Sequence, residues 1–382
     1  MIKASYNCFG LSDFLSILVV NQLFKWLELD KTMYFDGHVH DRDWEEAYKE
    51  TVEHVLNVAR DSGVDGIGIM PNTKPSIFTE ELAVARYNLA KAANIPEVAY
   101  FIWMGVTKDP EQIKRGIQAY RRLPFVLGFK MYGGNSTNQL GIVDVRDHFN
   151  VFNTFSNEGY DGSLLIHPEK EARMKPEIWD PRNPITHAFA RPAIAETESI
   201  RDMLGFAYLT GFKGKLHFVH VSTHEGVEYI NLAKKRGLDV SAGVCPHHLL
   251  LPYTEMLGIQ GLEKKMNPPL RAPGEPELLL EDLREGRIDF LETDHAPHTR
   301  KDKYEACASG VNALAWWPLF EEFFRRRGFT EKRIEEITFS AAVERFGADV
   351  IRKRKPIKDR RGDYEINPWR KLEEELGMVN KL

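Results

Sequence analysis

The chain is organised around one stretch, Met33-Tyr34-Phe35-Asp36-Gly37-His38-Val39-His40-Asp41-Arg42. Its first three residues are apolar and predict a short strand buried between two layers. Because alternate residues of a strand point to the same face, His38 and His40 project together from its end. Two imidazoles in this arrangement suit a divalent metal, whose nitrogen ligands lie at about 2.0–2.1 Å. Arg42 continues the two-residue period and adds a cation beyond the pair. The pair alone does not establish a metal site, so the prediction depends on ligands from later strands.

The composition is that of a globular protein. The chain has 382 residues, of which 43% are hydrophobic and 28% are charged, enough for one large domain or two ordinary ones. A net charge of −5 gives no electrostatic reason to expect nucleic acid or a membrane as partner. The three cysteines are far apart in sequence and form no disulfide pattern, which favours a reducing, cytoplasmic setting. The sequence leaves the oligomeric state open, with a homodimer as one option.

One apolar run near the N-terminus requires an interpretation. Residues 14–20 are too few to span a bilayer, and Asp13, Lys25 and Glu28 flank them. The run also lacks the basic start and small-residue cleavage site of a secretory signal. We interpret residues 1–32 as a helical extension that packs on the body of the protein.

From the opening strand onward, short apolar runs alternate with helical patterns. Strands are expected at 33–35, 66–70, 98–106, 126–132, 163–166, 215–221, 239–244 and 288–291, and helices at 44–62, 79–93, 110–121, 144–158, 193–210, 224–236 and 276–285. This alternation over about 260 residues predicts a (β/α)₈ TIM barrel. A doubly wound sheet would also alternate, but it gives no reason for polar residues at so many strand ends. We therefore expect a barrel at residues 33–350 and a charged C-terminal tail, 351–382, packed on it, with no evident β-sandwich domain.

The strand ends predict a metal site. In such a barrel the carboxyl ends of all strands open on one mouth, where the active site forms. The sequence places six candidate ligands there: His38, His40, Lys130, His167, His220 and Asp294. Four imidazoles and one carboxylate suffice for two divalent ions, but a bridging anion is missing. Lys130 would supply it if CO₂ carboxylates its amine, whereas an unmodified ammonium would repel the two cations.

The remaining polar residues have plainer interpretations. His217 lies on the opposite strand face from His220 and is expected to be packed. His247 and His248 are interpreted as supporting or structural residues. Asp294 alone could be a helix cap, but the histidine-rich segment that follows it favours catalysis. Four further histidines are expected to be ordinary surface or hydrogen-bonded residues: His54, His148, His187 and His224.

A lid is expected directly after Lys130. Residues 133–138 begin with two glycines, which can act as hinges without steric cost. Asn135, Ser136 and Thr137 bring hydrogen-bond donors that could close on a substrate. A static polar turn is the alternative.

Six motifs occur in order between residues 36 and 298: Asp36-Gly37-His38-Val39-His40-Asp41-Arg42, Met70-Pro71-Asn72-Thr73, Lys130-Met131-Tyr132, Leu165-Ile166-His167, Val219-His220-Val221-Ser222 and Thr293-Asp294-His295-Ala296-Pro297-His298. Together they resemble the dihydroorotases of the amidohydrolase superfamily, in the branch with a carboxylated lysine. The resemblance implies two zinc ions bridged by carboxylated Lys130, with Asp294 as both ligand and proton-transferring base. It also implies four substrate-binding residues: Arg42, Asn72, Asn267 and His298.

The resemblance implies a specific reaction on a small molecule. The family hydrolyses dihydroorotate reversibly to N-carbamoyl-aspartate, in the de novo synthesis of pyrimidines. Other cyclic amidohydrolases, such as dihydropyrimidinases, hydantoinases and allantoinases, act on substrates without the ring carboxylate that Arg42 would bind. A catalytically dead scaffold barrel is the rival from another class, but every candidate metal ligand is present. The glycine-containing segment at 308–312 matches the family's substrate-covering segment only loosely.

Overall fold

The computed structural model describes residues 34–135, 140–350 and 358–379. The expected N-terminal helix and the expected lid residues Ser136 and Thr137 lie outside these ranges. Among the helices in the described ranges, none combines the length and the apolar character needed to cross a membrane.

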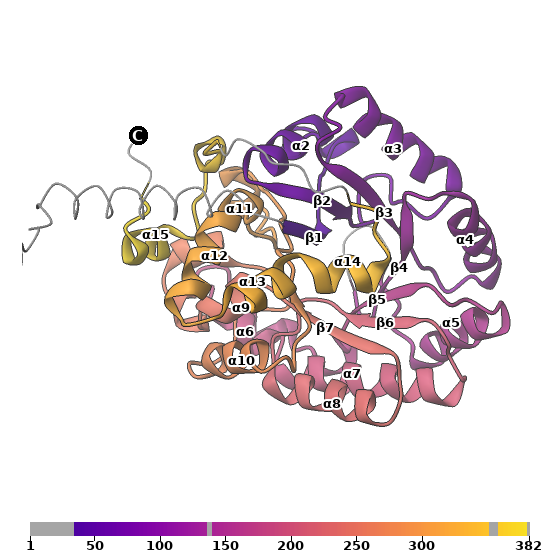
Figure 1. Cartoon of the computed structure of the whole chain (residues 1–382). Helices are drawn as coiled ribbons and strands as arrows, with labels where there is room; N and C mark the ends of the chain where they lie inside the picture. The colour runs from indigo at the N-terminus through magenta and orange to yellow at the C-terminus, as the bar shows by residue number, and fades with distance from the viewer. Residues whose placement is uncertain (1–33, 136–139, 351–357, 380–382) are drawn as a thin grey trace, which may run out of the picture.

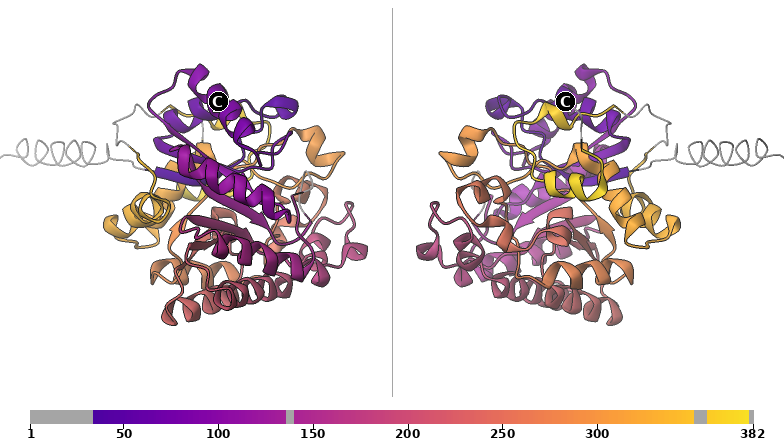
Figure 2. Two further views of the ribbon diagram at one scale, coloured as in Figure 1. Left: turned by 90° about the vertical axis from the view of Figure 1, so that its right-hand side faces the viewer. Right: turned by 90° about the vertical axis from the view of Figure 1, so that its left-hand side faces the viewer.

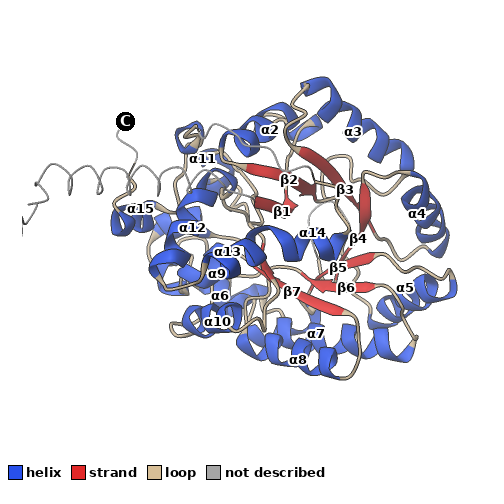
Figure 3. Cartoon of the chain, viewed as in Figure 1, coloured by secondary structure: helices blue, strands red, loops and turns tan. Residues whose placement is uncertain are grey.

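The core of the structure is a parallel sheet of eight strands in sequence order (Figures 1 and 3). The strands are β1 (Tyr34–Val39), β2 (Val64–Ile69), β3 (Ala99–Gly105), β4 (Val126–Tyr132), β5 (Ser163–His167), β6 (Lys215–Phe218), β7 (Val240–Val244) and β8 (Phe290–Leu291). The segment after β8 returns to β1, where the His40 N–H donates to the carbonyl of His295 at 2.8 Å. This contact brings the last strand end beside the first, and the prediction of a (β/α)₈ barrel is confirmed.

Helices pack around the outside of the strands, as perpendicular views show (Figure 2). Those that follow successive strands are α2 (Val52–Asp61), α3 (Glu80–Ala93), α4 (Pro110–Arg122), α5 (Val145–Asn157), α7 (Ala193–Leu209), α8 (His224–Lys235) and α10 (Glu275–Arg284). Shorter or later ones are α6 (Thr186–Ala190), α9 (Pro246–Leu250), α11 (Arg300–Tyr304), α12 (Trp317–Arg326), α13 (Glu331–Glu335), α14 (Ala341–Phe346) and α15 (Arg370–Leu376). Short 3₁₀ turns lie at Trp44–Glu46, Glu171–Arg173, Pro176–Ile178, Tyr253–Met256, Ile259–Lys264, Leu314–Trp316 and Arg361–Asp363, and a π-turn at Glu336–Ser340.

Local capping explains several of these boundaries. The Thr79 hydroxyl accepts the N–H of Leu82 at the start of α3, and Asp109 caps α4 ahead of Pro110. The expected start of the helix at 44–62 is wrong, because α2 begins at Val52. The Asp43 carboxylate accepts the Val52 N–H at 2.8 Å, so the chain turns before the helix starts.

The barrel interior away from the mouth is filled by aromatic side chains. Phe35 on β1, Trp103 on β3 and Phe290 on β8 all contact Phe346 of α14, with ring centroids 6.4, 4.9 and 5.3 Å away. Figure 1 shows α14 lying across the strands at this end. Since this end is plugged, the polar strand ends at the opposite mouth are the place for a site.

The described part of the C-terminal tail packs on the barrel. Trp369 is 1% exposed, and its indole N–H donates to the carbonyl of Asn312 at 2.6 Å. The Asn312 amide donates in turn to the carbonyl of Ile366 at 2.9 Å. These contacts connect the tail to the segment that follows β8. The division of the chain into domains stays an interpretation.

Candidate metal centre

A cavity of about 320 Å³ opens at the carboxyl ends of the strands. It is lined by all ten residues predicted to bind metal or substrate: His38, His40, Arg42, Asn72, Lys130, His167, His220, Asn267, Asp294 and His298. Asn135, the one predicted lid residue within the described ranges, is exposed at its rim. Residues more than 250 positions apart are therefore neighbours here, because each stands at the end of a strand or in the loop after it.

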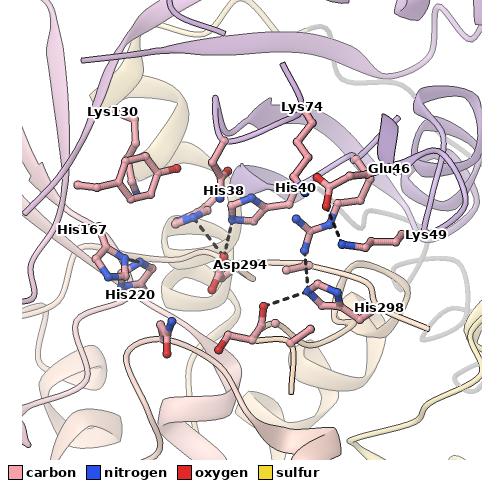
Figure 4. Close-up of a pocket in the computed structure, with 18 of the residues that line it drawn as sticks. His38, His40, Glu46, Lys49, Lys74, Lys130, His167, His220, Asp294 and His298 are labelled. Carbon is pink, nitrogen blue, oxygen red and sulfur yellow. Dashed lines mark hydrogen bonds and ion pairs between the residues drawn. The ribbon is translucent and has the colours of Figure 1, made fainter. Parts of the chain in front are cut away.

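Asp294 faces His38 on β1 and His40 directly after it (Figure 4). One of its oxygens, Oδ1, lies 3.2 Å from Nε2 of His38 and 2.9 Å from Nε2 of His40. Potential ligand atoms of these three side chains all lie within 4.8 Å of one another. Two imidazole nitrogens and a carboxylate oxygen this close are a suitable donor set for zinc.

A second pair of histidines lies across the cavity (Figure 4). Nδ1 of His167 is 2.9 Å from Nε2 of His220, and the His220 and His38 rings are 5.2 Å apart. Nε2 of His167 lies 2.9 Å from the carboxylate of buried Glu169. A proton on Nε2, donated to Glu169, leaves the Nδ1 lone pair facing the cavity. This is the orientation that metal-binding histidines commonly have.

Lys130 lies on β4 with its side chain fully buried against the cavity. Its Nζ has no hydrogen-bond partner among the described residues. Burial lowers the pKa of Lys130 to about 7, with the charges of Glu292 and Asp294 acting in the opposite direction. An amine with this pKa is substantially neutral near pH 7, and the neutral form is the one that reacts with CO₂. The orphaned, buried amine therefore fits the predicted carboxylation.

The protonation states of the other candidates also fit divalent ions. Burial lowers the pKa of His38 and His220 well below that of a free imidazole, and it lowers that of His40 as well. Burial alone would raise the pKa of Asp294, but the hydrogen bond and charge of His40 bring it below the usual value. Neutral imidazoles and an ionised carboxylate are the forms that bind metal.

Two of the candidate ligands have strained backbone. The φ angles of His220 and Asp294 are 40° and 49°, in the left-handed region that side chains other than glycine rarely adopt. The Glu292 carboxylate accepts the His220 N–H at 2.5 Å, and the Thr293 hydroxyl accepts the His295 N–H at 3.1 Å. Such strain costs about 1–3 kcal/mol per residue and is typical of functional sites. It also explains why β6 ends at Phe218 rather than at the expected residue 221.

The outer part of the cavity carries groups suited to an anion. Nη2 of Arg42 lies 3.0 Å from Nε2 of His298, and the Arg42 side chain is nearly buried. Oδ1 of Asn267 lies 2.9 Å from Nε2 of His187, a residue outside the cavity lining. Lys74, which sequence reasoning missed, lines the same cavity near Asn72. Lys74 directly follows the motif Met70-Pro71-Asn72-Thr73, and this position could have identified it from the sequence.

The histidines given plainer interpretations lie away from the cavity lining. His217 stacks on Phe290 with ring centroids 4.9 Å apart, and its Nδ1 lies 2.8 Å from the Ser241 hydroxyl. Nε2 of His248 donates to the carbonyl of Pro268 at 3.1 Å. Potential ligand atoms of Cys245, His247 and His248 also lie within 4.8 Å of one another, all buried.

Curated proteins that this chain resembles include several dihydroorotases. No protein-family model matches the chain. A dihydroorotase from Staphylococcus epidermidis is 32% identical over 308 residues, covering 77% of this chain and 68% of the relative. A dihydroorotase from Carboxydothermus hydrogenoformans is 32% identical over 323 residues, covering 80% of this chain and 70% of the relative.

Solved structures share the fold at lower identity. An L-hydantoinase from Arthrobacter aurescens superposes with a TM-score of 0.73 at 22% identity, covering 86% of this chain and 74% of its own. A dihydroorotase from Saccharomyces cerevisiae, in complex with 5-fluoroorotic acid, superposes with a TM-score of 0.68 at 20% identity. The match covers 83% of this chain and 84% of that structure's chain.

Proposed function

Because the chain belongs to the dihydroorotase family of cyclic amide hydrolases, we propose that it interconverts (S)-dihydroorotate and N-carbamoyl-L-aspartate in pyrimidine synthesis. The observation that carries the substrate assignment is the position of Arg42. Its nearly buried guanidinium lines the same cavity as the candidate metal ligands. A ring carboxylate bound there would place the neighbouring amide of a small substrate beside Asp294.

We propose that six side chains hold two zinc ions: His38, His40, His167, His220, Asp294 and a carboxylated Lys130. When bound, such ions lower the pKa of a water molecule and polarise the carbonyl of the amide to be cleaved. The unpartnered Nζ of Lys130 supports this assignment, since a carboxylated lysine supplies the bridging anion that the other five residues lack.

Asp294 is the proposed proton carrier. Its low pKa keeps the carboxylate ionised, so it can accept a proton from the water as the water attacks the amide carbonyl carbon. It then returns the proton to the ring nitrogen as the amide carbon–nitrogen bond breaks, and this nitrogen becomes the NH₂ of the carbamoyl group.

Arg42 is proposed to bind the substrate carboxylate. A guanidinium presents two parallel N–H groups that match the two carboxylate oxygens, and burial strengthens this pairing. His298, 3.0 Å from Arg42, and the amides of Asn72 and Asn267 line the cavity around it and would fix the orientation of the ring.

Hydantoin and dihydropyrimidine hydrolysis is the second candidate function, favoured by the hydantoinases among the structural neighbours. Those neighbours are at most 22% identical, so they support the fold and not the substrate. The ring carboxylate that Arg42 would bind is absent from hydantoin and dihydrouracil.

The deciding experiment is an assay of the zinc-loaded protein against dihydroorotate, dihydrouracil, hydantoin and allantoin. A charge-assisted pair between Arg42 and the substrate carboxylate is worth about 2–5 kcal/mol. The kcat/KM for dihydroorotate should therefore exceed the kcat/KM values for dihydrouracil, hydantoin and allantoin at least about 30-fold. A higher kcat/KM for hydantoin or dihydrouracil would overturn the assignment. Inactivity towards all four substrates, with metal bound, would favour a scaffold.

A further inference from the structure

Glu292 is a buried carboxylate directly behind two of the candidate metal ligands. It precedes Asp294 by two residues and is 0% exposed. Its Oε1 accepts the backbone N–H of His220 at 2.5 Å and lies 3.8 Å from Nδ1 of His38. Its other oxygen, Oε2, lies 3.5 Å from Nε2 of His217. One side chain therefore contacts the residues at the ends of β1 and β6.

The structure makes room for this carboxylate on the neighbouring strand. Gly243 on β7 pairs in register with Phe290 on β8. A Cβ atom at Gly243 would lie 2.6 Å from both Cδ and Oε1 of Glu292, closer than such atoms can approach. Gly243 on β7 and Glu292, directly after β8, thus form one structural unit.

The close contacts of Glu292 are with two imidazoles and a backbone N–H. Within the described ranges, the ion-pair partners within 4.0 Å of its oxygens are His38 and His217, and no guanidinium or ammonium group lies this close. A buried carboxylate without a cation is unfavourable, and such a group persists where something else offsets its charge.

Divalent ions in the cavity would provide that offset. His38 presents Nε2 towards Asp294 at 3.2 Å, while its Nδ1 faces Glu292 on the other side. Nδ1 of His38 forms no hydrogen bond within the described ranges, and at 3.8 Å the Glu292 carboxylate acts on this nitrogen through its charge, which makes the near nitrogen a better ligand. The hydrogen bond from the His220 backbone has a similar effect, because it holds a strained residue in place.

We propose that Glu292 is a positioning residue that holds His38 and His220 for metal binding and balances part of the metal charge, with Gly243 as its required neighbour. The proposal rests on the proposed function, since it takes both histidines to be metal ligands. It concerns residues that neither bind substrate nor line the cavity.

The test compares zinc affinity and stability in two matched variants. Glu292→Gln keeps the size of the side chain but removes the charge. Asp282→Asn on α10 is the control, because Asp282 is equally buried but pairs with His224 and Arg287, whose contacts with it lie at 2.8 and 2.5 Å. Zinc dissociation constants are measured by competition with a chromogenic chelator. Melting temperatures are measured for each protein with zinc and after zinc removal.

A positioning role predicts opposite results for the two variants. Glu292→Gln should bind zinc about 10- to 100-fold more weakly. Its metal-free form should melt no lower than wild type, since an uncompensated buried charge is gone. Asp282→Asn should keep wild-type zinc affinity and lose stability in the metal-free form.

The Gly243–Glu292 unit gives a second, independent measurement. Gly243→Ala should weaken zinc binding in the wild-type background, because the new methyl group displaces the carboxylate. In a Glu292→Ala background the same change should alter the zinc dissociation constant less than about twofold, since the space is vacant.

The outcomes separate this proposal from the proposed function. If wild type binds no zinc, both fail. If wild type binds zinc and Glu292→Gln binds it equally well while its metal-free form is destabilised, Glu292 is merely structural and only this inference fails. Equal effects of Gly243→Ala on the zinc dissociation constant in the wild-type and Glu292→Ala backgrounds would also overturn this inference.

Discussion

Nε2 of His40 lies 2.9 Å from Oδ1 of Asp294, although 254 positions separate the two residues. His40 follows β1 and Asp294 follows β8, so the contact forms only when the first and last strands of the barrel come together. The carboxylate thereby reaches the imidazoles of His38 and His40, and its pKa falls below the usual value. Closure of the barrel and assembly of the candidate centre are the same event.

Asp294→Asn should abolish most of the activity without unfolding the protein. An amide cannot carry the proton between water and the ring nitrogen, so kcat for dihydroorotate should fall at least about 100-fold. Circular dichroism checks the fold. Asp289→Asn, near the start of β8 and 29% exposed at its side chain, is the control and should keep activity near wild type. More than a tenth of wild-type kcat in Asp294→Asn would exclude the proposed role.

Arg42→Met should damage turnover of dihydroorotate selectively. Loss of a buried charge-assisted pair is worth about 2–5 kcal/mol, so kcat/KM for dihydroorotate should fall about 30-fold or more. Dihydrouracil, which has no ring carboxylate, should be affected far less. Arg42→Lys keeps the charge without the paired N–H groups and should be intermediate. Equal losses for both substrates would mean that Arg42 is structural.

Glu50 predicts a pH-dependent contribution to stability. Burial alone would raise its pKa, but the charge and hydrogen bond of His295 and of His54 lower it to about 2. A carboxyl whose folded pKa lies below its unfolded value of 4.5 stabilises the fold above pH 4.5. That contribution is lost as pH falls from 4.5 towards 2. Glu50→Gln should therefore lower the free energy of unfolding by about 3 kcal/mol at pH 7 and by less at pH 3.5. Urea denaturation at both pH values measures this, and a difference that grows at low pH would contradict it.

Trp369→Ala should show how far the C-terminal tail stabilises the barrel. Trp369 is 1% exposed, bonds to the Asn312 carbonyl, and packs edge-on against Phe320 with ring centroids 4.8 Å apart. Its truncation should cost about 3–5 kcal/mol in urea denaturation. Tyr208→Ala on α7, where the side chain is 77% exposed, should change stability by less than about 0.5 kcal/mol. Equally small losses of unfolding free energy in Trp369→Ala and Tyr208→Ala would show that the tail contributes little to the stability of the barrel.

Much of the fold was predictable, because each buried strand is a short apolar run that ends in a polar residue. His38, Lys130 and His167 could be placed at one mouth from this pattern alone. The start of the helix expected at 44–62 was wrong for a reason that strand and helix patterns do not contain. Arg42, Asp43 and Trp44 all have φ near 50°, and α2 begins eight residues later than expected, at Val52, whose N–H the Asp43 carboxylate accepts.

The supporting carboxylates were missed. Glu169 lies two residues after His167, and Glu292 lies two residues before Asp294. Both lie beyond the ends of their strands, where the two-residue period of a strand no longer assigns a face. Their contacts, with Arg191 for Glu169 and with the His220 backbone for Glu292, depend on other strands and loops and could not be read from the sequence.

The zinc content of Lys130→Ala, measured beside wild type, tests the central claim most directly. Both proteins are purified, saturated with zinc in bicarbonate buffer, passed over a desalting column and analysed by atomic emission. Burial of the unpartnered amine at the cavity motivates the choice of residue. We predict close to two zinc ions per chain in wild type, and at most one in Lys130→Ala together with loss of dihydroorotate turnover. A single tightly bound ion in wild type, retained unchanged with full activity in Lys130→Ala, would contradict the account.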